Sequence, residues 1–299
     1  MISFADKLGK ERFLVADGAM GTELQKLGLE PGACPEELNI TVPEAVMKVH
    51  TGYIEAGSDI ILTNTFGANR ARLKMHGFET RVEEFCNAAF SAAKKCAAGK
   101  EILIAGSIGP CGELISPLGE LSEEETSEIF REPAAALANA GVDLFVIETM
   151  MAPEEALIAL RAVKSVTDKP VIVSMSFERG NSGLRTMWGT DIPTAASLFE
   201  NAGAGGIGAN CGRGFDEMMD ISEEMCKATK LPVWLKSNAG LPVWEDGRSV
   251  YTQSPEFILP YIEGMLRNGA NIIGGCCGST PEHIRAITAT VKRYKEKFS

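Results

Sequence analysis

Short apolar runs recur along the whole chain, and a glycine-rich or polar turn and then an amphipathic stretch follow each one. A short amphipathic helix opens the chain, and eight such units come after it, with helices of about 10 to 20 residues. Nearly continuous apolar strands that alternate with helices are typical of a parallel sheet covered by helices. The predicted strands span residues 13–17, 59–63, 102–107, 143–148, 171–177, 206–210, 233–236 and 271–274.

Eight such units without a second compositional block predict a single domain over residues 1–299, an α/β fold of the closed (β/α)8 TIM-barrel type. A doubly wound open sheet is the alternative, and residues 203–208 do contain a Gly-x-Gly-x-x-Gly pattern. That pattern follows a predicted helix and leads into a strand, which is the reverse of the dinucleotide-binding order. We therefore expect a barrel whose active site lies at the C-terminal ends of the strands.

The composition narrows the possible partners. The chain has 45% hydrophobic residues, a net charge of -11 and a pI near 5.0. An acidic protein of this kind is not attracted to nucleic acid or to an anionic membrane, so we expect neither as a partner. The sequence has no 18-residue apolar run and no signal-peptide pattern, and its eight cysteines show no disulfide spacing. We expect a cytoplasmic protein with reduced cysteines.

Residues 271–283 carry the most distinctive chemistry, because Cys276 and Cys277 are adjacent within them. In an extended strand the two side chains would point to opposite faces, so a bend is needed before they can bind one metal. We expect Gly274, Gly275 and Gly278 to supply that bend through positive φ angles. The following Ser-Thr-Pro sequence predicts the start of a helix. The alternatives are two buried hydrophobic cysteines or a strained disulfide.

A third thiol comes from the end of the sixth predicted strand, where Cys211 follows Asn210. Only the seventh strand separates it from Cys276 and Cys277, so all three thiols can meet at one end of the barrel. Three thiolates without a fourth protein ligand are typical of a zinc site with one open position. Such a site suits the binding of a substrate thiol as thiolate, since a free thiol with a pKa of about 8.5 is mostly protonated at neutral pH.

Two carboxylates end strands on the same face. Asp17 and Glu148 are candidates for binding a substrate ammonium group, although each can instead cap a helix or stabilise a loop. The loop that contains Gly18, Gly21 and Thr22 offers backbone amides and a hydroxyl to a substrate carboxylate. Together these groups would recognise an amino acid. The three histidines lie outside the strand ends, so we expect surface or packing roles for them.

Several motifs in order resemble the homocysteine S-methyltransferase family, in particular the homocysteine-binding module of cobalamin-dependent methionine synthases. They are DGAMGT (17–22), PEELN (35–39), TNTFG (63–67), SIGP (107–110), NC (210–211), NAG (238–240) and GGCCG (274–278). The resemblance implies a zinc-dependent barrel that methylates homocysteine to methionine. It implies that Cys211, Cys276 and Cys277 bind the metal, that Asp17 and Glu148 bind the amino acid, and that Asn238 lies beside the metal. Asn210 and Asn238 are further candidate substrate-binding residues.

The methyl donor is the open question. Residues 1–299 contain no Asp-x-His-x-x-Gly signature for binding cobalt, so we expect cobalamin only on a separate corrinoid protein that docks on the barrel. S-methylmethionine or betaine as a direct donor is one alternative, and a non-catalytic zinc-binding subunit is another. Three departures from the family pattern bear on this question: Cys111, Lys236-Ser237 before Asn238, and the long segment 178–189. We do not expect Cys111 to be an obligatory zinc ligand.

Overall fold

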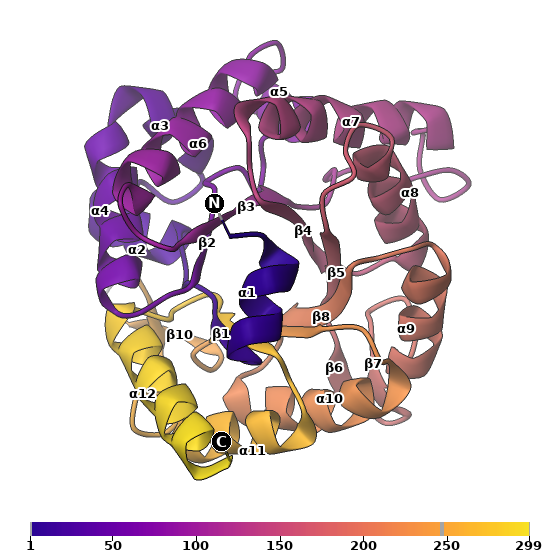
Figure 1. The fold of residues 1–299 in the computed structure, drawn as a ribbon. Helices are drawn as coiled ribbons and strands as arrows, with labels where there is room; N and C mark the ends of the chain where they lie inside the picture. Colours follow the sequence, from indigo (N-terminus) through magenta and orange to yellow (C-terminus); the bar gives the residue numbers. More distant parts are fainter. Residues whose placement is uncertain (1, 246–247, 299) are drawn as a thin grey trace.

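The chain folds as a parallel barrel. The computed structural model describes residues 2–245 and 248–298, and its main sheet has eight parallel strands in the order β1-β12-β9-β8-β5-β4-β3-β2 (Figure 1). These strands are β1 (Leu14–Val15), β2 (Ile60–Leu62), β3 (Leu103–Ile108), β4 (Leu144–Met150), β5 (Val171–Met175), β8 (Gly206–Cys211), β9 (Val233–Ser237) and β12 (Ile272–Gly275). The predicted TIM barrel is confirmed, and each predicted strand agrees with an observed one to within two residues at either end.

The barrel closes between β1 and β2 through what we call the β1–β2 seam. One bridge joins Ala16 to Ile60, with few backbone hydrogen bonds around it. Two aspartate side chains provide further acceptors. The Asp59 carboxylate accepts the Val15 N–H at 2.9 Å, and the Asp17 carboxylate accepts the Leu62 N–H at 2.7 Å. Side chains therefore contribute to the closure of the barrel.

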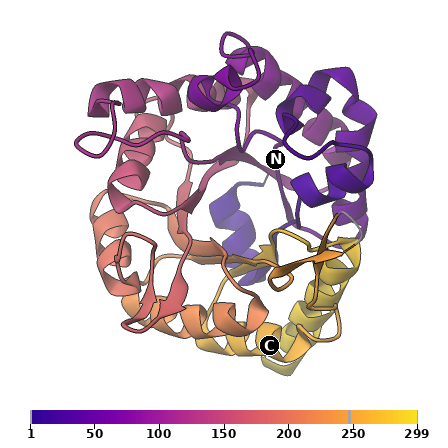
Figure 2. The ribbon, with the colours of Figure 1, turned by 180° about the vertical axis from the view of Figure 1, so that it is seen from behind.

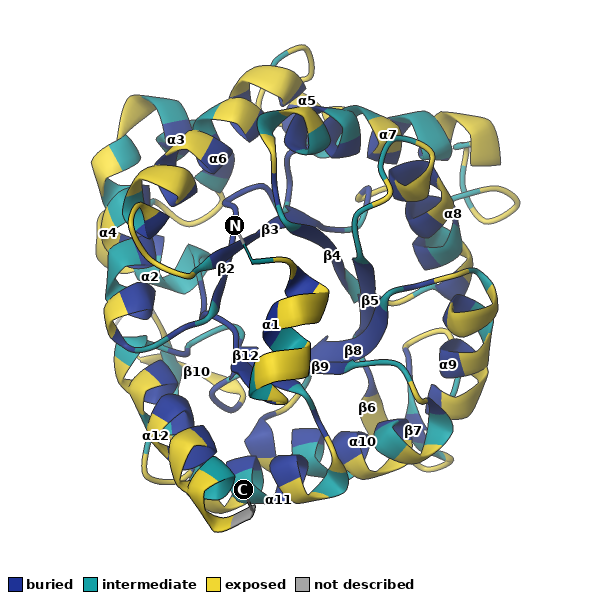
Figure 3. Cartoon of the chain, in the orientation of Figure 1, coloured by how far each residue is buried: buried dark blue, intermediate teal, exposed yellow. Residues whose placement is uncertain are grey.

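Helices cover the outside of the barrel, and α1 (Phe4–Glu11) lies across its N-terminal end (Figure 1). Their inner faces are buried and their outer faces exposed, as amphipathic sequences require (Figure 3). The others are α2 (Gly21–Lys26), η1 (Pro35–Glu37), α3 (Leu38–Thr41), α4 (Pro43–Glu55), α5 (Arg70–Lys74), α6 (Val82–Ala97), α7 (Glu123–Ala140), α8 (Pro153–Lys164), α9 (Ile192–Asn201), α10 (Phe215–Ala228), α11 (Leu259–Asn268) and α12 (Pro281–Phe298). Among the described residues, no helix has the length and apolar character needed to cross a membrane.

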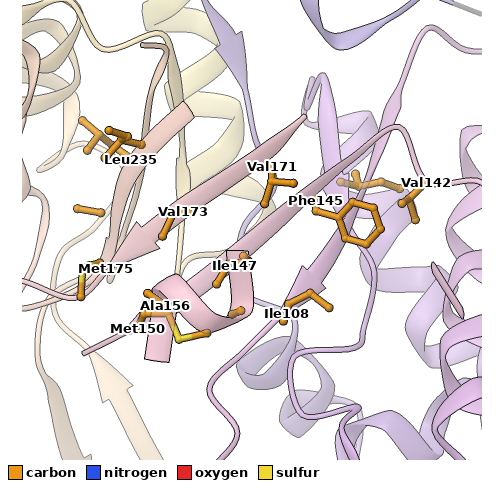
Figure 4. Close-up of a cluster of buried hydrophobic side chains, with 14 of the residues drawn as sticks. Ile108, Val142, Phe145, Ile147, Met150, Ala156, Val171, Val173, Met175 and Leu235 are labelled. Atoms are coloured by element: carbon orange, nitrogen blue, oxygen red, sulfur yellow. The ribbon is translucent and has the colours of Figure 1, made fainter. Parts of the chain in front are cut away.

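Two apolar clusters hold the strands in place. One fills the barrel, where alternate strand residues such as Leu14, Leu144 and Trp234 pack together with Phe4 of α1. The larger one lies between strands and helices, and Figure 4 shows part of it around β3, β4 and β5. A barrel filled in this way is a rigid base rather than a pore, so the groups at its C-terminal end have fixed positions.

Two β-hairpins interrupt the regular alternation, where the sequence predicted that helices would follow. The first, β6 (Glu178–Gly180) with β7 (Gly183–Arg185), comes after β5, and the second, β10 (Pro242–Glu245) with β11 (Arg248–Tyr251), comes after β9. Both follow strand C-termini, so they lie at the end of the barrel opposite α1 (Figure 2). The first explains why segment 178–189 is long, whereas the second was not expected.

Candidate functional site

A polar layer replaces the apolar filling at the C-terminal end of the barrel. It consists of buried side chains from five consecutive strands of the sheet: Ser107 on β3, Glu148 on β4, Ser174 on β5, Asn210 on β8 and Lys236 on β9. The burial of so many polar groups is costly unless each is paired or used. We call this layer the polar floor, and the candidate site lies on it.

Three cysteines meet above the polar floor. Cys211 ends β8, while Cys276 and Cys277 directly follow β12. Their three Sγ atoms lie within 4.8 Å of one another, and those of Cys211 and Cys276 are 3.2 Å apart. We call this group the three-cysteine cluster. All three thiols are free, so neither a disulfide nor separate packing of the two adjacent cysteines describes them.

The glycines around the pair act differently from the prediction. Only Gly278 has a positive φ, at 78°, and it makes the bend after the pair. Gly274 and Gly275 belong to β12, where there is no space for a side chain. A Cβ at Gly274 would lie 2.7 Å from the Asp17 carbonyl oxygen, and one at Gly275 would lie 2.1 Å from the Ser279 Oγ. Their predicted role in bending the chain is therefore wrong, and close packing explains why both are glycine.

Two residues at or beside the three-cysteine cluster have strained backbone conformations. Cys211 and Thr149 both have positive φ angles, of 64° and 62°, which non-glycine residues rarely adopt. Asn210 connects them: its Oδ1 accepts the Thr149 N–H at 2.8 Å and its Nδ2 donates to the Thr149 Oγ1 at 2.7 Å. Ser174 also donates to this Oδ1, at 2.7 Å. Strained residues of this kind are common at functional sites. The sequence carried no local signal for Thr149.

The electrostatics of the cluster favour a bound cation. Hydrogen bonds from the Cys211 and Cys276 thiols lower the pKa of Cys277 to about 3, whereas the hydrogen bond to Cys276 raises that of Cys211. One thiolate therefore forms readily, but further ionisation crowds negative charge into a buried space. A divalent cation would offset this charge.

The geometry also fits zinc. Zn–S bonds of about 2.3 Å in a tetrahedral site place sulfur atoms roughly 3.8 Å apart, close to the spacing of the cluster. Asn238 adds a second indication, because its Oδ1 is buried without a hydrogen-bond partner while its Nδ2 donates to the Gly212 carbonyl at 2.7 Å. A buried orphan acceptor usually marks a group that a ligand or ion satisfies.

Asp17 and Glu148 lie in different environments. Asp17 is 2% exposed, and its two oxygens bind the Lys236 ammonium at 2.5 Å and the Leu62 N–H at 2.7 Å. Glu148 accepts a hydrogen bond from the Ser107 hydroxyl at its Oε1, at 2.5 Å. Burial raises the pKa of Glu148 to about 7, although Lys236 opposes the shift. Lys236 was noted in the sequence only as a departure, and its pairing with Asp17 was missed.

The loop after β1 is anchored to the start of α12. The Ala19 N–H donates to the Ser279 Oγ at 3.2 Å, and the Thr22 Oγ1 accepts the Gly278 N–H at 3.2 Å. Gly18 packs against the Tyr53 ring, so a Cβ there would lie 2.6 Å from the ring, whereas Gly21 begins α2 in open space. These contacts hold the loop beside the residues that follow Cys276 and Cys277.

The remaining candidates lie elsewhere. The buried Cys111 donates to the Glu113 carbonyl at 3.2 Å and is not part of the three-cysteine cluster. His50 is buried in α4, His76 is exposed, and His283 contacts Thr280 at the start of α12. The expected surface and packing roles of the histidines are confirmed.

Comparison with known proteins identifies the family. The sequence profile of the homocysteine S-methyltransferase family matches residues 14–291. The chain belongs to this family. Among homocysteine S-methyltransferase relatives, the methionine synthases of Mycobacterium leprae and Mycobacterium tuberculosis are each 30% identical to it over 95% of its length. The chain spans about a quarter of the length of these relatives.

A solved structure of a homocysteine methyltransferase has the same fold as this chain. The metallated homocysteine methyltransferase MmuM from Escherichia coli superposes with a TM-score of 0.79 and 24% sequence identity. The match covers 95% of this chain and 98% of that chain. The two proteins therefore share the barrel over nearly their whole lengths.

Proposed function

We propose that the chain is a zinc-dependent methyltransferase that methylates the thiolate of homocysteine to give methionine, with a separate methylcorrinoid protein as the donor. The observation that carries the proposal is the three-cysteine cluster on the polar floor of a homocysteine S-methyltransferase barrel. Cys211, Cys276 and Cys277 would bind the metal and leave one position open. A zinc ion held there would supply the Lewis acidity that keeps an acceptor thiol deprotonated at neutral pH.

The surrounding residues would orient the acceptor. Glu148 supplies negative charge that favours the acceptor ammonium group, whereas Asp17, which the resemblance implied as a second ammonium ligand, is already paired with Lys236. The loop with Gly18, Gly21 and Thr22 borders the space for the acceptor carboxylate. Asn210 holds the strained backbone at Thr149 and donates to the Cys211 Sγ at 3.5 Å, and the Oδ1 of Asn238 is buried without a hydrogen-bond partner. In the reaction the thiol loses its proton, the sulfur forms the new S–C bond, and the donor keeps the electron pair of the bond that it loses.

Exposed apolar side chains around the site support a protein as donor. We call them the apolar rim: Leu114 and Leu118 after β3, Met187 and Trp188 after β5, and Val243 and Trp244 after β9. All lie in segments that follow strand C-termini, and Figure 2 shows that end of the barrel from the side opposite α1. Exposed apolar groups in several loops at one end of a barrel are typical of a protein interface, whereas a small donor does not require them.

The donor is identified by a parallel assay. The zinc-loaded chain is incubated with homocysteine and, separately, with methylcobalamin, a methylated corrinoid protein from the same cell, S-methylmethionine and betaine, and methionine is quantified. We expect the corrinoid protein to support the fastest turnover. Faster methylation from S-methylmethionine or betaine would reject the corrinoid donor, and no methionine from any donor would indicate a non-catalytic subunit.

The apolar rim is tested by the variant Trp244→Glu, which we expect to raise the KM for the corrinoid protein and to leave that for homocysteine unchanged. Ala5→Glu is the matched control, because it adds the same charge at an exposed position of α1, at the other end of the barrel. Equal behaviour of the two variants would argue against docking on the apolar rim.

A further inference from the structure

On the basis of the function proposed above, we propose that Lys236 is a specificity-determining residue of the acceptor site. Its ammonium group occupies the place beside Asp17, so the acceptor ammonium is received by Glu148 alone, and thiols whose only charge is positive are rejected. Lys236 is buried on β9 within the polar floor, a position at which an unpaired lysine is strongly disfavoured.

Both carboxylate oxygens of Asp17 already have a partner. Its Oδ1 lies 2.5 Å from the Lys236 Nζ, and its Oδ2 accepts the Leu62 N–H at 2.7 Å. The side chains of Lys236 and Asp17 are only 4% and 3% exposed, so solvent does not compete for the pair. An acceptor ammonium would have to displace Lys236 into an apolar barrel to reach this carboxylate, which is costly.

Glu148 is the carboxylate of the polar floor, and it is less occupied than Asp17. The Ser107 hydroxyl binds its Oε1, and among the described residues it forms no ion pair within 4.0 Å. Its charge and that of Lys236 nevertheless act on each other across the floor, since Lys236 favours ionisation of Glu148. Glu148 thus combines a negative charge with an oxygen that no salt bridge occupies.

This division of roles predicts the class of acceptor. With Asp17 and Lys236 neutralising each other, ionised Glu148 is the single uncompensated negative charge of the site, and the Lys236 ammonium is a fixed positive charge in the same floor. A zwitterionic thiol satisfies Glu148 with its ammonium group and has a carboxylate that Lys236 attracts. A thiol with only an ammonium group is attracted by Glu148 but repelled by Lys236, and it has no carboxylate for Lys236 to attract.

Two fragments of homocysteine test this prediction by calorimetry on the zinc-loaded chain: 4-mercaptobutyrate, which lacks the ammonium group, and 3-mercaptopropylamine, which lacks the carboxylate. In the wild type we expect homocysteine to bind best and 3-mercaptopropylamine worst. Glu148→Gln should reduce the preference for homocysteine over 4-mercaptobutyrate to about one, since no other group receives the ammonium. A preference that survives in Glu148→Gln would overturn the inference. If no thiol binds the zinc-loaded wild type at all, the proposed function itself fails.

The second arm changes Lys236. In Lys236→Met, 3-mercaptopropylamine should gain on 4-mercaptobutyrate by about tenfold or more, as expected when one charge in a buried site is removed. The double variant Asp17→Asn/Lys236→Met leaves no buried unpaired charge, so it remains informative if the single variant does not fold. In the double variant, 3-mercaptopropylamine should gain on 4-mercaptobutyrate by less than half of the Lys236→Met gain on a logarithmic scale. The reason is that the Asp17 carboxylate, which attracts the amine once Lys236 is removed, is absent. An unchanged ranking in Lys236→Met, or a full tenfold gain in the double variant, would overturn the inference.

Discussion

Glu148→Gln is the variant whose effect can be worked out most fully from the structure. The substitution keeps the size of the side chain and its hydrogen bond with Ser107, but it removes the negative charge. A hydrogen bond between charged groups contributes about 1.5 to 3 kcal/mol, so the affinity for an acceptor with an ammonium group should fall roughly 10- to 100-fold. Bound zinc should stay unchanged, because Glu148 is not in the three-cysteine cluster.

The pH dependence gives a second, independent signature. Burial raises the pKa of Glu148 to about 7, above its ordinary value of 4.5. Its charged fraction then rises from about one tenth at pH 6 to about nine tenths at pH 8, so affinity for an ammonium group should rise about tenfold over this range. In Glu148→Gln this rise should be absent.

The assay uses 2-aminobutyrate, which has the ammonium and carboxylate groups of the acceptor but no thiol, so that titration of the metal-bound sulfur does not contribute. Dissociation constants are measured by calorimetry at pH 6, 7 and 8 for the wild type, Glu148→Gln and Ser107→Ala. Ser107→Ala is the matched control: it keeps the charge, loses one hydrogen bond and should move the pH response upward. The same affinity and the same pH response in Glu148→Gln and the wild type would refute an ammonium-binding role for Glu148.

Three further predictions follow from described contacts. Serine at any position of the three-cysteine cluster should remove most of the bound zinc and nearly all activity, a second serine should add little, and Cys111→Ser should keep the metal, as elemental analysis can show. Gly278→Ala should lower the unfolding free energy by about 1 to 3 kcal/mol, because φ is 78° and a Cβ would lie 2.0 Å from the Tyr251 ring; Gly9→Ala, with nothing within 4 Å, should cost nothing. Burial lowers the pKa of His50 from 6.5 to about 4, so stability should be full above pH 6.5 and fall by about 3 kcal/mol as the pH drops to 4; His50→Leu should flatten this slope in denaturant titrations.

The barrel could be predicted because each unit carries its own local signal. Nearly continuous apolar runs set the strands, and their order places Cys211 and Cys276 on the same face. The hairpin of β10 and β11 was missed because its two segments, PVWE (242–245) and RSVY (248–251), mix polar with apolar residues and so form no apolar run. The Asp246-Gly247 pair between the two short segments, a sequence typical of a two-residue hairpin turn, was the available signal.

The chemistry of the floor depended on contacts that no local pattern reveals. Lys236 and Asp17 are far apart in the sequence, and their pairing requires that β12 lies between β9 and β1 with only glycine, Gly274, beside Lys236. The same holds for Thr149, whose unusual backbone is set by Asn210 from another strand. Sequence therefore identified which residues face the site, while tertiary packing decided which of them remain available to a substrate.

The β1–β2 seam links the stability of the barrel to the integrity of the site. It has one bridge, and the carboxylate of Asp17 that accepts the Leu62 N–H also binds Lys236. Local opening between β1 and β2 would therefore also separate the Asp17 carboxylate from Lys236 in the polar floor. Amide exchange at Leu62 should report on both, with slower exchange whenever a ligand orders the floor. Substitutions at Asp17 would then change the rate of local opening between β1 and β2 together with acceptor affinity. Activity measurements alone would not separate the two effects.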